Sequence, residues 1–477
     1  MRMILAAVAA LLFASSAYAG GPAIRVGATE DRVKQTSLVQ AKAQFELFKL
    51  AGLDAVRATS VWAPGAVSPN AEELRKLDNL VGAARLANIA VYVGVANFGS
   101  RTTPLTPEVR AEFAAYAATI AKRYPSLRGL IVGNEPNLNR FWLPQFNPDG
   151  SNAAAPAFLE LLAQSYDAIK AVSPRMRVIG IGLSPRGNDR PDGTRLTHSP
   201  TKFLRDLGIA YRASGRTLPV MDALAFHPYG DNSSQSPTFE HPRTTSIGIA
   251  DYGKLVGLLA EAFDGTAQKG STLPILYDEY GIETQIPAAK STLYNGTEPT
   301  TTRPTDEATQ GSFYGTAIAL AFCQPRVEGI LLFHTVDEET LATWQSGLFY
   351  ADGTAKASVP AVRDAASRSR RAVIAKCEGL QLTPRLRLVR WPTASLLRKH
   401  RASVSFTCHI DCRYEALLTR AGRLVTLKVG TAVGGVRKAV PLRANLAGGL
   451  YTVRLTLTAP VNTGPPLQRT SAPLRVP

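Results

Sequence analysis

The chain has 477 residues, of which 45% are hydrophobic and 19% charged, and its 54 Lys and Arg exceed its 37 Asp and Glu to give a net charge of +17. This length predicts two domains, one of them large, and this composition excludes a disordered chain, a collagen and a coiled coil. The net charge alone would suggest nucleic acid, an anionic polymer or a membrane surface as a partner, so its distribution along the chain matters.

Residues 1–19 have the pattern of a secretory signal peptide. Basic Arg2 precedes an apolar run over residues 3–13, and Ala-Tyr-Ala at 17–19 supplies a small-residue cleavage site. The apolar run is shorter than the roughly 20 residues of a membrane-spanning helix, and no later stretch is long enough. We therefore expect cleavage, secretion of the mature chain and no membrane span.

From residue 20 to about 375, short β-branched runs alternate with longer segments in which apolar residues recur at helical spacing. Eight such units favour a (β/α)8 TIM barrel with enlarged loops over an open sheet, which usually has fewer units. The predicted strands are residues 24–28, 55–62, 90–97, 129–136, 177–183, 223–230, 274–281 and 327–335. The predicted helices are residues 38–50, 71–86, 107–124, 157–172, 200–213, 249–263, 309–323 and 360–375.

From residue 376 to 477 the pattern changes to short alternating runs separated by glycine-containing turns, with no helical segment. The runs are residues 386–391, 403–407, 414–419, 424–429, 436–442 and 451–458. This pattern predicts a second, all-β domain, a small antiparallel sandwich of immunoglobulin or fibronectin type.

Most of the excess charge belongs to this second domain. Residues 376–477 contain 17 basic and three acidic residues, which leaves a balance of only +2 for residues 20–375. The basic domain could adhere to an anionic cell-wall polymer, or it could be a solvated β domain rich in Arg. We expect no nucleic-acid partner and a monomeric chain.

The chain has four cysteines, and an even number in an exported protein suggests disulfides. Of the three possible pairings we favour Cys323 with Cys377, which would tie the last two barrel helices together, and Cys408 with Cys412, which would close a short loop.

A zinc site is the alternative for the last two cysteines. His400 and His409 lie near Cys408 and Cys412, and thiolate and imidazole ligands at short spacing suit tetrahedral zinc. The sequence contains no phosphate-binding Walker loop, no dinucleotide fingerprint and no His-Glu-x-x-His motif. We therefore expect no metal and no cofactor.

Two glutamates end predicted strands of the barrel. Glu135 follows the apolar run of the fourth strand, and Glu279 follows that of the seventh. Active sites of these barrels lie at the C-terminal ends of the strands, and a carboxylate there is costly to bury without a task or a partner. Such a pair can cleave a glycosidic bond, because one carboxyl group protonates the leaving oxygen while the other attacks the anomeric carbon.

Asn134-Glu135-Pro136 after the fourth strand, with Glu279 ending the seventh, resembles the large clan of retaining (β/α)8 glycoside hydrolases that includes cellulases, mannanases and xylosidases. The resemblance covers nearly all of residues 24–365. It implies Glu135 as general acid/base, Glu279 as nucleophile and Asn134 as the residue that binds the sugar 2-hydroxyl. A stabilising ion-pair network is the alternative for this set.

Further polar residues fit the same resemblance. It implies that Arg57, in the second strand, contacts the nucleophile and keeps it ionised. It also implies that His227 and Tyr229, at the end of the sixth strand, border the nucleophile, although a His after a strand is more often structural. Asp278 alternates to the other side of the seventh strand, so we expect a structural role. Glu283 is the reserve candidate for the nucleophile.

Sugar rings stack on aromatic side chains, so tryptophans near the strand ends are natural subsites, with ordinary loop packing as the alternative. Trp62 follows the second strand, Trp142 lies in the loop after the fourth and Trp344 in the loop after the eighth. Many clan members carry a Trp at the end of strand eight. Here residues 332–335 read Leu-Phe-His-Thr, so Trp344 would have to reach in from its loop.

The sequence therefore predicts a secreted retaining glycoside hydrolase that acts on a β-linked glycoside or polysaccharide through a covalent intermediate. The alternative is a non-catalytic surface protein whose barrel binds glycan or the cell wall. The presence of both Glu135 and Glu279 argues against that alternative, because a protein that only binds needs neither.

Overall fold

The computed structural model of this protein describes residues 20–374, 377, 388–397, 401–408, 412–443, 445–458 and 467–477, with the backbone alone for 388–397. The expected signal peptide at residues 1–19 lies outside the described residues. So do the expected domain boundary after residue 375 and the two histidines of the zinc alternative, His400 and His409.

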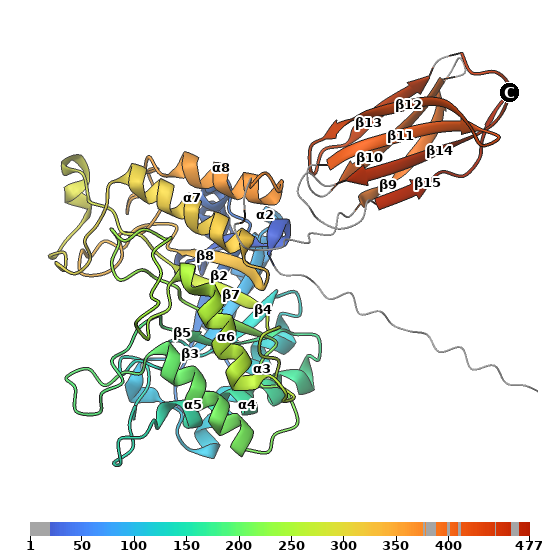
Figure 1. The fold of residues 1–477 in the computed structure, drawn as a ribbon. Helices are drawn as coiled ribbons and strands as arrows, with labels where there is room; N and C mark the ends of the chain where they lie inside the picture. The colour runs from blue at the N-terminus through green and yellow to red at the C-terminus, as the bar shows by residue number, and fades with distance from the viewer. Residues whose placement is uncertain are drawn as a thin grey trace, which may run out of the picture.

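Eight parallel strands form a closed barrel in chain order, and β8 pairs with β1 to close it, with Phe333 opposite Thr29. The strands are β1 (Arg25–Thr29), β2 (Ala55–Trp62), β3 (Ala90–Asn97), β4 (Gly129–Val132), β5 (Val178–Leu183), β6 (Ala223–Phe226), β7 (Ile275–Tyr280) and β8 (Val327–Phe333). The helices lie around the barrel (Figure 1) and are α1 (Leu38–Ala51), α2 (Ala71–Ala87), α3 (Pro107–Arg123), α4 (Ala154–Val172), α5 (Pro200–Ala213), α6 (Tyr252–Phe263), α7 (Glu307–Cys323) and α8 (Val359–Arg370). The predicted TIM barrel is confirmed.

Local sequence signals explain where several helices begin. The side chains of Asn70, Thr106, Ser199 and Asp306 accept hydrogen bonds from backbone N–H groups in the first turns of α2, α3, α5 and α7. These caps satisfy donors that have no partner inside the helix. The helices therefore start close to their predicted first residues.

The inside of the barrel is packed with side chains. Its apolar layer consists of buried Ala55, Tyr92, Ile131, Ile179, Ala223, Ala225, Leu276 and Leu331. Two residues beyond Ala55, Ala225 and Leu276 come Arg57, His227 and Asp278, which face the same side because side chains alternate along a strand. A buried charged layer therefore lies above the apolar one, toward the C-terminal mouth.

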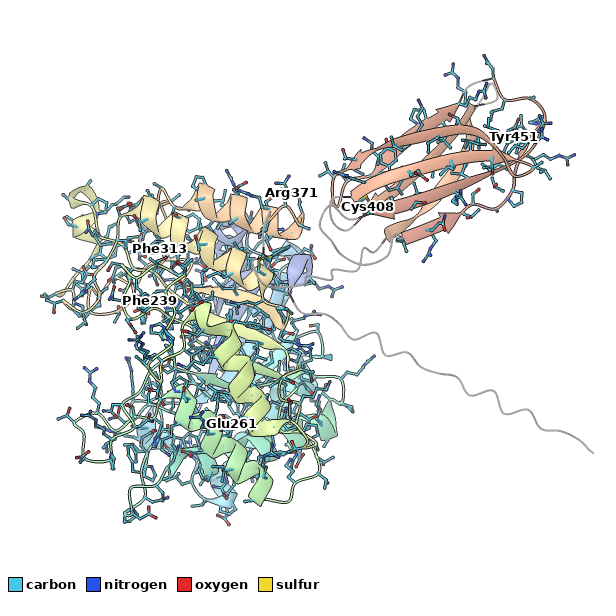
Figure 2. The ribbon with its side chains drawn as sticks, in the orientation of Figure 1. Phe239, Glu261, Phe313, Arg371, Cys408 and Tyr451 are labelled. Atoms are coloured by element: carbon cyan, nitrogen blue, oxygen red, sulfur yellow. A yellow bond between two sulfur atoms is a disulfide. The ribbon has the colours of Figure 1, made fainter. Side chains whose placement is uncertain are left out.

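The C-terminal strands form two antiparallel sheets, with strand orders β13-β10-β9 and β12-β11-β14-β15, and β16 pairs with β14. They are β9 (Leu388–Leu397), β10 (Arg401–Cys408), β11 (Cys412–Arg420), β12 (Arg423–Ala432), β13 (Lys438–Arg443), β14 (Gly449–Thr458), β15 (Leu467–Thr470) and β16 (Leu474–Val476). Both sheets contribute to one buried cluster, which includes Val404 and Leu455. Cys408 and Tyr451 also belong to it and lie toward opposite ends of the strands (Figure 2). The all-β prediction is confirmed, but β15 and β16, which are short, were not predicted.

Disulfide bonds join Cys323 to Cys377 and Cys408 to Cys412, the two pairs favoured from the sequence. The first ties the end of α7 to the chain just after α8. The second removes both thiolates that the zinc alternative needs. In the part of the chain that the structure describes, no helix is both long and apolar enough to cross a bilayer.

Candidate active site

Glu135 lies just beyond the C-terminal end of β4, where the backbone turns sharply. Val132 ends the strand, and Gly133 and Glu135 have positive φ angles of 92° and 42°. A β-carbon at Gly133 would lie 2.6 Å from the ring of Phe158 in α4, so only glycine fits there. The N–H of Glu135 donates to the carbonyl of Gly182 in β5 at 2.7 Å, which holds the turn in place. The Glu135 side chain remains 14% exposed, so a ligand can reach it.

Two donors hold the carboxylate of Glu279, near the end of β7. Nη1 of Arg57 donates to Oε1, and the hydroxyl of Tyr229 donates to Oε2 at 3.0 Å. Nη2 of Arg57 donates to Oδ1 of Asn134 at 3.2 Å. Asn134 thus uses its oxygen within the protein, and its amide nitrogen is the donor that it can offer to a ligand. Arg57 is the third residue of β2, which continues to Trp62.

His227 lies between the two glutamates. Its Nδ1 is 3.0 Å from Oε1 of Glu135 and 3.4 Å from Oε2 of Glu279. Its Nε2 is 3.4 Å from Oδ1 of Asp278. Burial alone would lower the pKa of this imidazole, but the carboxylates around it raise the pKa to about 10. His227 is therefore a buried cation at neutral pH.

These contacts limit the separation of the two glutamates. Oε1 of Glu135 and Oε2 of Glu279 contact the same nitrogen at 3.0 and 3.4 Å, so these oxygens are no more than the sum of those distances, 6.4 Å, apart. The mouth of the barrel can thus present two carboxyl groups to one ligand, with positive charge behind them. Among the described residues, no group of three or more His, Cys, Asp or Glu side chains could hold a metal ion.

Asp278 belongs to this charged cluster, which the sequence did not indicate. Its carboxylate oxygens lie 3.5 Å from Nη1 of Arg57 and 3.4 Å from Nε2 of His227, and its side chain is fully buried. The side chains of Asp278 and Glu279 were expected on opposite sides of the seventh strand, with Asp278 away from the site. The side that Asp278 faces is instead the inside of the barrel. Glu279 still reaches the mouth because the pairing of β7 with β8 becomes irregular there.

An aromatic cluster borders the carboxylate of Glu279. The ring of Trp344 lies 5.1 Å from that of Tyr229 at an interplanar angle of 30°, and 5.2 Å from that of Phe333 at 82°. Phe333 ends β8, and Phe333 and Trp344 are both half-buried. The loop after β8 thus brings Trp344 beside a residue that holds Glu279.

The other two predicted aromatic subsites are wrong. Trp62 is fully buried, with its ring edge-on to Phe113 of α3, and Trp142 is buried edge-on to Phe158 of α4. Neither ring can stack on a sugar. Trp62 is five residues beyond Arg57, which faces the inside of the barrel, so strict alternation places Trp62 on the outer face. That spacing was visible in the sequence.

No protein-family model matches the chain, and no curated protein matches it. Many solved structures share its fold. A family 39 glycoside hydrolase from the gut symbiont Bacteroides cellulosilyticus WH2 has 15% sequence identity and a TM-score of 0.54, over 88% of this chain and 82% of that one. A glucosidase from Croceicoccus marinus has 12% identity and a TM-score of 0.50, over 93% and 97%. A GH5_18 protein from Streptomyces cattleya, in complex with GlcNAc, has 18% identity and a TM-score of 0.50, over 73% and 80%. At these identities the likeness shows a common fold.

Proposed function

We propose that the protein is a glycoside hydrolase that cleaves a β-linked glycoside or polysaccharide with retention of configuration. The observation that carries the proposal is the limit of 6.4 Å between Oε1 of Glu135 and Oε2 of Glu279, which both contact Nδ1 of His227. Retaining enzymes hold their two carboxyl groups about 5–5.5 Å apart, whereas inverting enzymes leave roughly 6.5–9.5 Å to admit a water molecule.

In this mechanism Glu279 attacks the anomeric carbon while Glu135 protonates the leaving oxygen, and a covalent glycosyl-enzyme forms. Glu135 then takes a proton from a water molecule, which displaces Glu279. The donors on both oxygens of Glu279 fix its direction of attack. Asn134 binds the sugar 2-hydroxyl and Trp344 stacks on the apolar face of the ring. The reaction needs no cofactor.

Glu279→Gln tests the proposal on a panel of aryl β-glycosides. We expect the variant to lose turnover, and the wild type to release the β-anomer first, as seen by proton NMR. The control is Glu261→Gln, which removes an exposed carboxylate on α6, labelled in Figure 2 and paired with Arg205. Full activity of Glu279→Gln, or an inverted first product, would contradict the proposal.

The alternative function is a non-catalytic glycan-binding protein. It would show carbohydrate binding in calorimetry without turnover on any member of the same panel. Two observations count against it: the donors on both oxygens of Glu279, and the second carboxyl group within reach of the same ligand. A protein that only binds glycan has no need of either.

We further infer that the chain is exported and that its C-terminal sheets adhere to an anionic cell-wall polymer. Both disulfides suit an oxidising compartment. In the described part of these sheets and their loops, Glu415 is the one acidic side chain, whereas the exposed basic side chains are Arg401, Arg413, Arg420, Arg423, Lys428, Arg437, Arg443, Arg454 and Arg475.

Cosedimentation of the full-length protein tests this adhesion. We expect binding to an insoluble anionic polysaccharide at low salt, release at about 0.5 M NaCl because salt screens exposed charges, and no binding to cellulose. Binding to cellulose alone would assign the retention to the barrel instead.

A further inference from the structure

We propose that Asp278 is a positioning residue, whose buried charge keeps His227 an imidazolium and holds Arg57 in place at the mouth of the barrel. Its effect on catalysis rests on the proposed glycosidase function. The charge of His227 does not, because it can be measured without a substrate.

Asp278 is enclosed by two cations. Oδ2 faces Nη1 of Arg57 at 3.5 Å, Oδ1 faces Nε2 of His227 at 3.4 Å, and all three side chains are buried. Within the described residues, neither oxygen has a partner at hydrogen-bond geometry. A carboxylate removed from water in this way depends on nearby opposite charge. Burial alone would raise the pKa of Asp278, but His227 and Arg57 outweigh it and lower the pKa.

His227 has carboxylates on both sides of its ring. The charged or titratable side chains that face it are Glu135 from the end of β4, Asp278 and Glu279 from β7, Arg57 from β2 and Tyr229 from the loop after β6. A neutral imidazole has one ring nitrogen without a hydrogen, which would point a lone pair at a carboxylate. Both ring nitrogens of His227 therefore carry protons.

The three carboxyl groups around His227 do not share the nearby cations equally. Asp278 and Glu279 each contact Arg57 as well as His227. Of the described cations, only His227 lies within 4.0 Å of Glu135. Within this distance, Asp278 and Glu279 therefore each have two cationic partners, whereas Glu135 has one.

The first test uses the wild-type protein without substrate. The chain has six His, so their ¹⁵N imidazole signals can be followed by NMR on a tag-free sample, and His227 can be assigned from its absence in His227→Gln. We expect His227 to stay doubly protonated at pH 8, where an ordinary His, with a pKa of about 6.5, is neutral. A neutral His227 at pH 8 overturns the proposal, whether or not the protein is a glycosidase.

The second test is Asp278→Asn, which keeps the shape of the side chain and removes its charge. Without that charge, the groups around it lose their protons at lower pH. We expect His227 to titrate about one to three pH units lower than in the wild type, and both limbs of the pH profile of kcat/KM to shift toward acid. A variant with lower activity but unmoved limbs and an unmoved His227 has lost only packing, which overturns the proposal.

The matched control is Asp251→Asn. It removes another buried carboxylate that contacts a buried histidine, His241 at 2.7 Å, at the start of α6. We expect the His227 titration and the pH profile to stay at their wild-type positions. If Asp278→Asn does not fold, the titration of His227 in the wild type still tests the proposal. If the wild type turns over no glycoside, the proposed function fails, but the titration of His227 remains a test of the role of Asp278.

Discussion

Nδ1 of His227 lies 3.0 Å from Oε1 of Glu135, although the two residues are 92 positions apart in the chain. The same nitrogen contacts Glu279, so one buried cation links both carboxyl groups at the mouth. This is possible because the C-terminal ends of all strands of a barrel meet at one mouth. The carboxyl groups are thus held close together before a ligand binds, which lowers the cost of reaching a reactive geometry.

The loss of kcat/KM on replacement of Glu135 should depend on the leaving group of the substrate. Glu135→Ala removes the proposed acid, so we expect kcat/KM to fall by about 10²- to 10⁴-fold for glycosides with a sugar as leaving group. A dinitrophenyl leaving group departs without a proton, so the fall should be much smaller. Steady-state kinetics on the two substrates check this, and equal falls would remove Glu135 from the role of acid.

Replacement of Trp344 should weaken binding. Because an aromatic contact is worth roughly 0.5–1.5 kcal/mol, Trp344→Ala should raise KM several-fold with a smaller effect on kcat. Trp62→Phe is the control, because Trp62 is buried away from the mouth and should change the melting temperature but not KM. An unchanged KM in Trp344→Ala would show that its ring does not touch the substrate.

Glu283 should make stability depend on pH. Burial, together with Glu298 and Asp337, raises its pKa from 4.5 to about 7, and its side chain is nearly inaccessible. Because the folded-state pKa is the higher one, folding takes up a proton between about pH 4.5 and 7, and stability falls as pH rises through that range. Glu283→Gln should therefore match the wild type near pH 4.5 and exceed it above pH 7, by at most about 3 kcal/mol. Urea unfolding at both pH values measures this, and a constant difference would contradict it.

Gly133→Ala should damage both stability and activity. The added methyl group would clash with Phe158 and displace Glu135. Gly353→Ala separates this clash from backbone strain, because Gly353 has a similar φ of 79° but nothing within 4 Å of the added carbon. We expect Gly353→Ala to lower the free energy of unfolding by about 1–2 kcal/mol and to keep its activity. Gly133→Ala should lower the free energy of unfolding by more. Equal costs in thermal unfolding would show that the ring of Phe158 moves aside.

The two disulfides should contribute different amounts to the free energy of unfolding. Cys323–Cys377 joins residues 54 positions apart, and Cys408–Cys412 joins residues 4 apart. Loop-closure entropy predicts about 4 kcal/mol for the first and about 2 kcal/mol for the second. Denaturant unfolding of the two Cys-to-Ser double variants measures both values. A larger cost for the short loop would show that local contacts, and not chain entropy, dominate.

The arrangement of the chain could be predicted because its signals are local. The bounds of β2 and α5 agree with the predictions for residues 55–62 and 200–213, since alternation and helical spacing are visible within a few residues. The same local signals put Glu135 and Glu279 after the fourth and seventh strands. The fold, the order of its elements and the proposed catalytic pair were therefore accessible from the sequence.

The contacts of those residues were decided by tertiary structure. Asp278 was assigned to the wrong surroundings, because the inner face of β7 becomes defined only when the barrel closes. Trp344 contacts Tyr229 because the loop after β8 folds back over the mouth, which no local pattern encodes. Periodicity depends on neighbours in the chain and determined the elements. The charged cluster instead joins side chains of β2 and β7 with side chains just beyond β4 and β6, which meet only in the folded barrel.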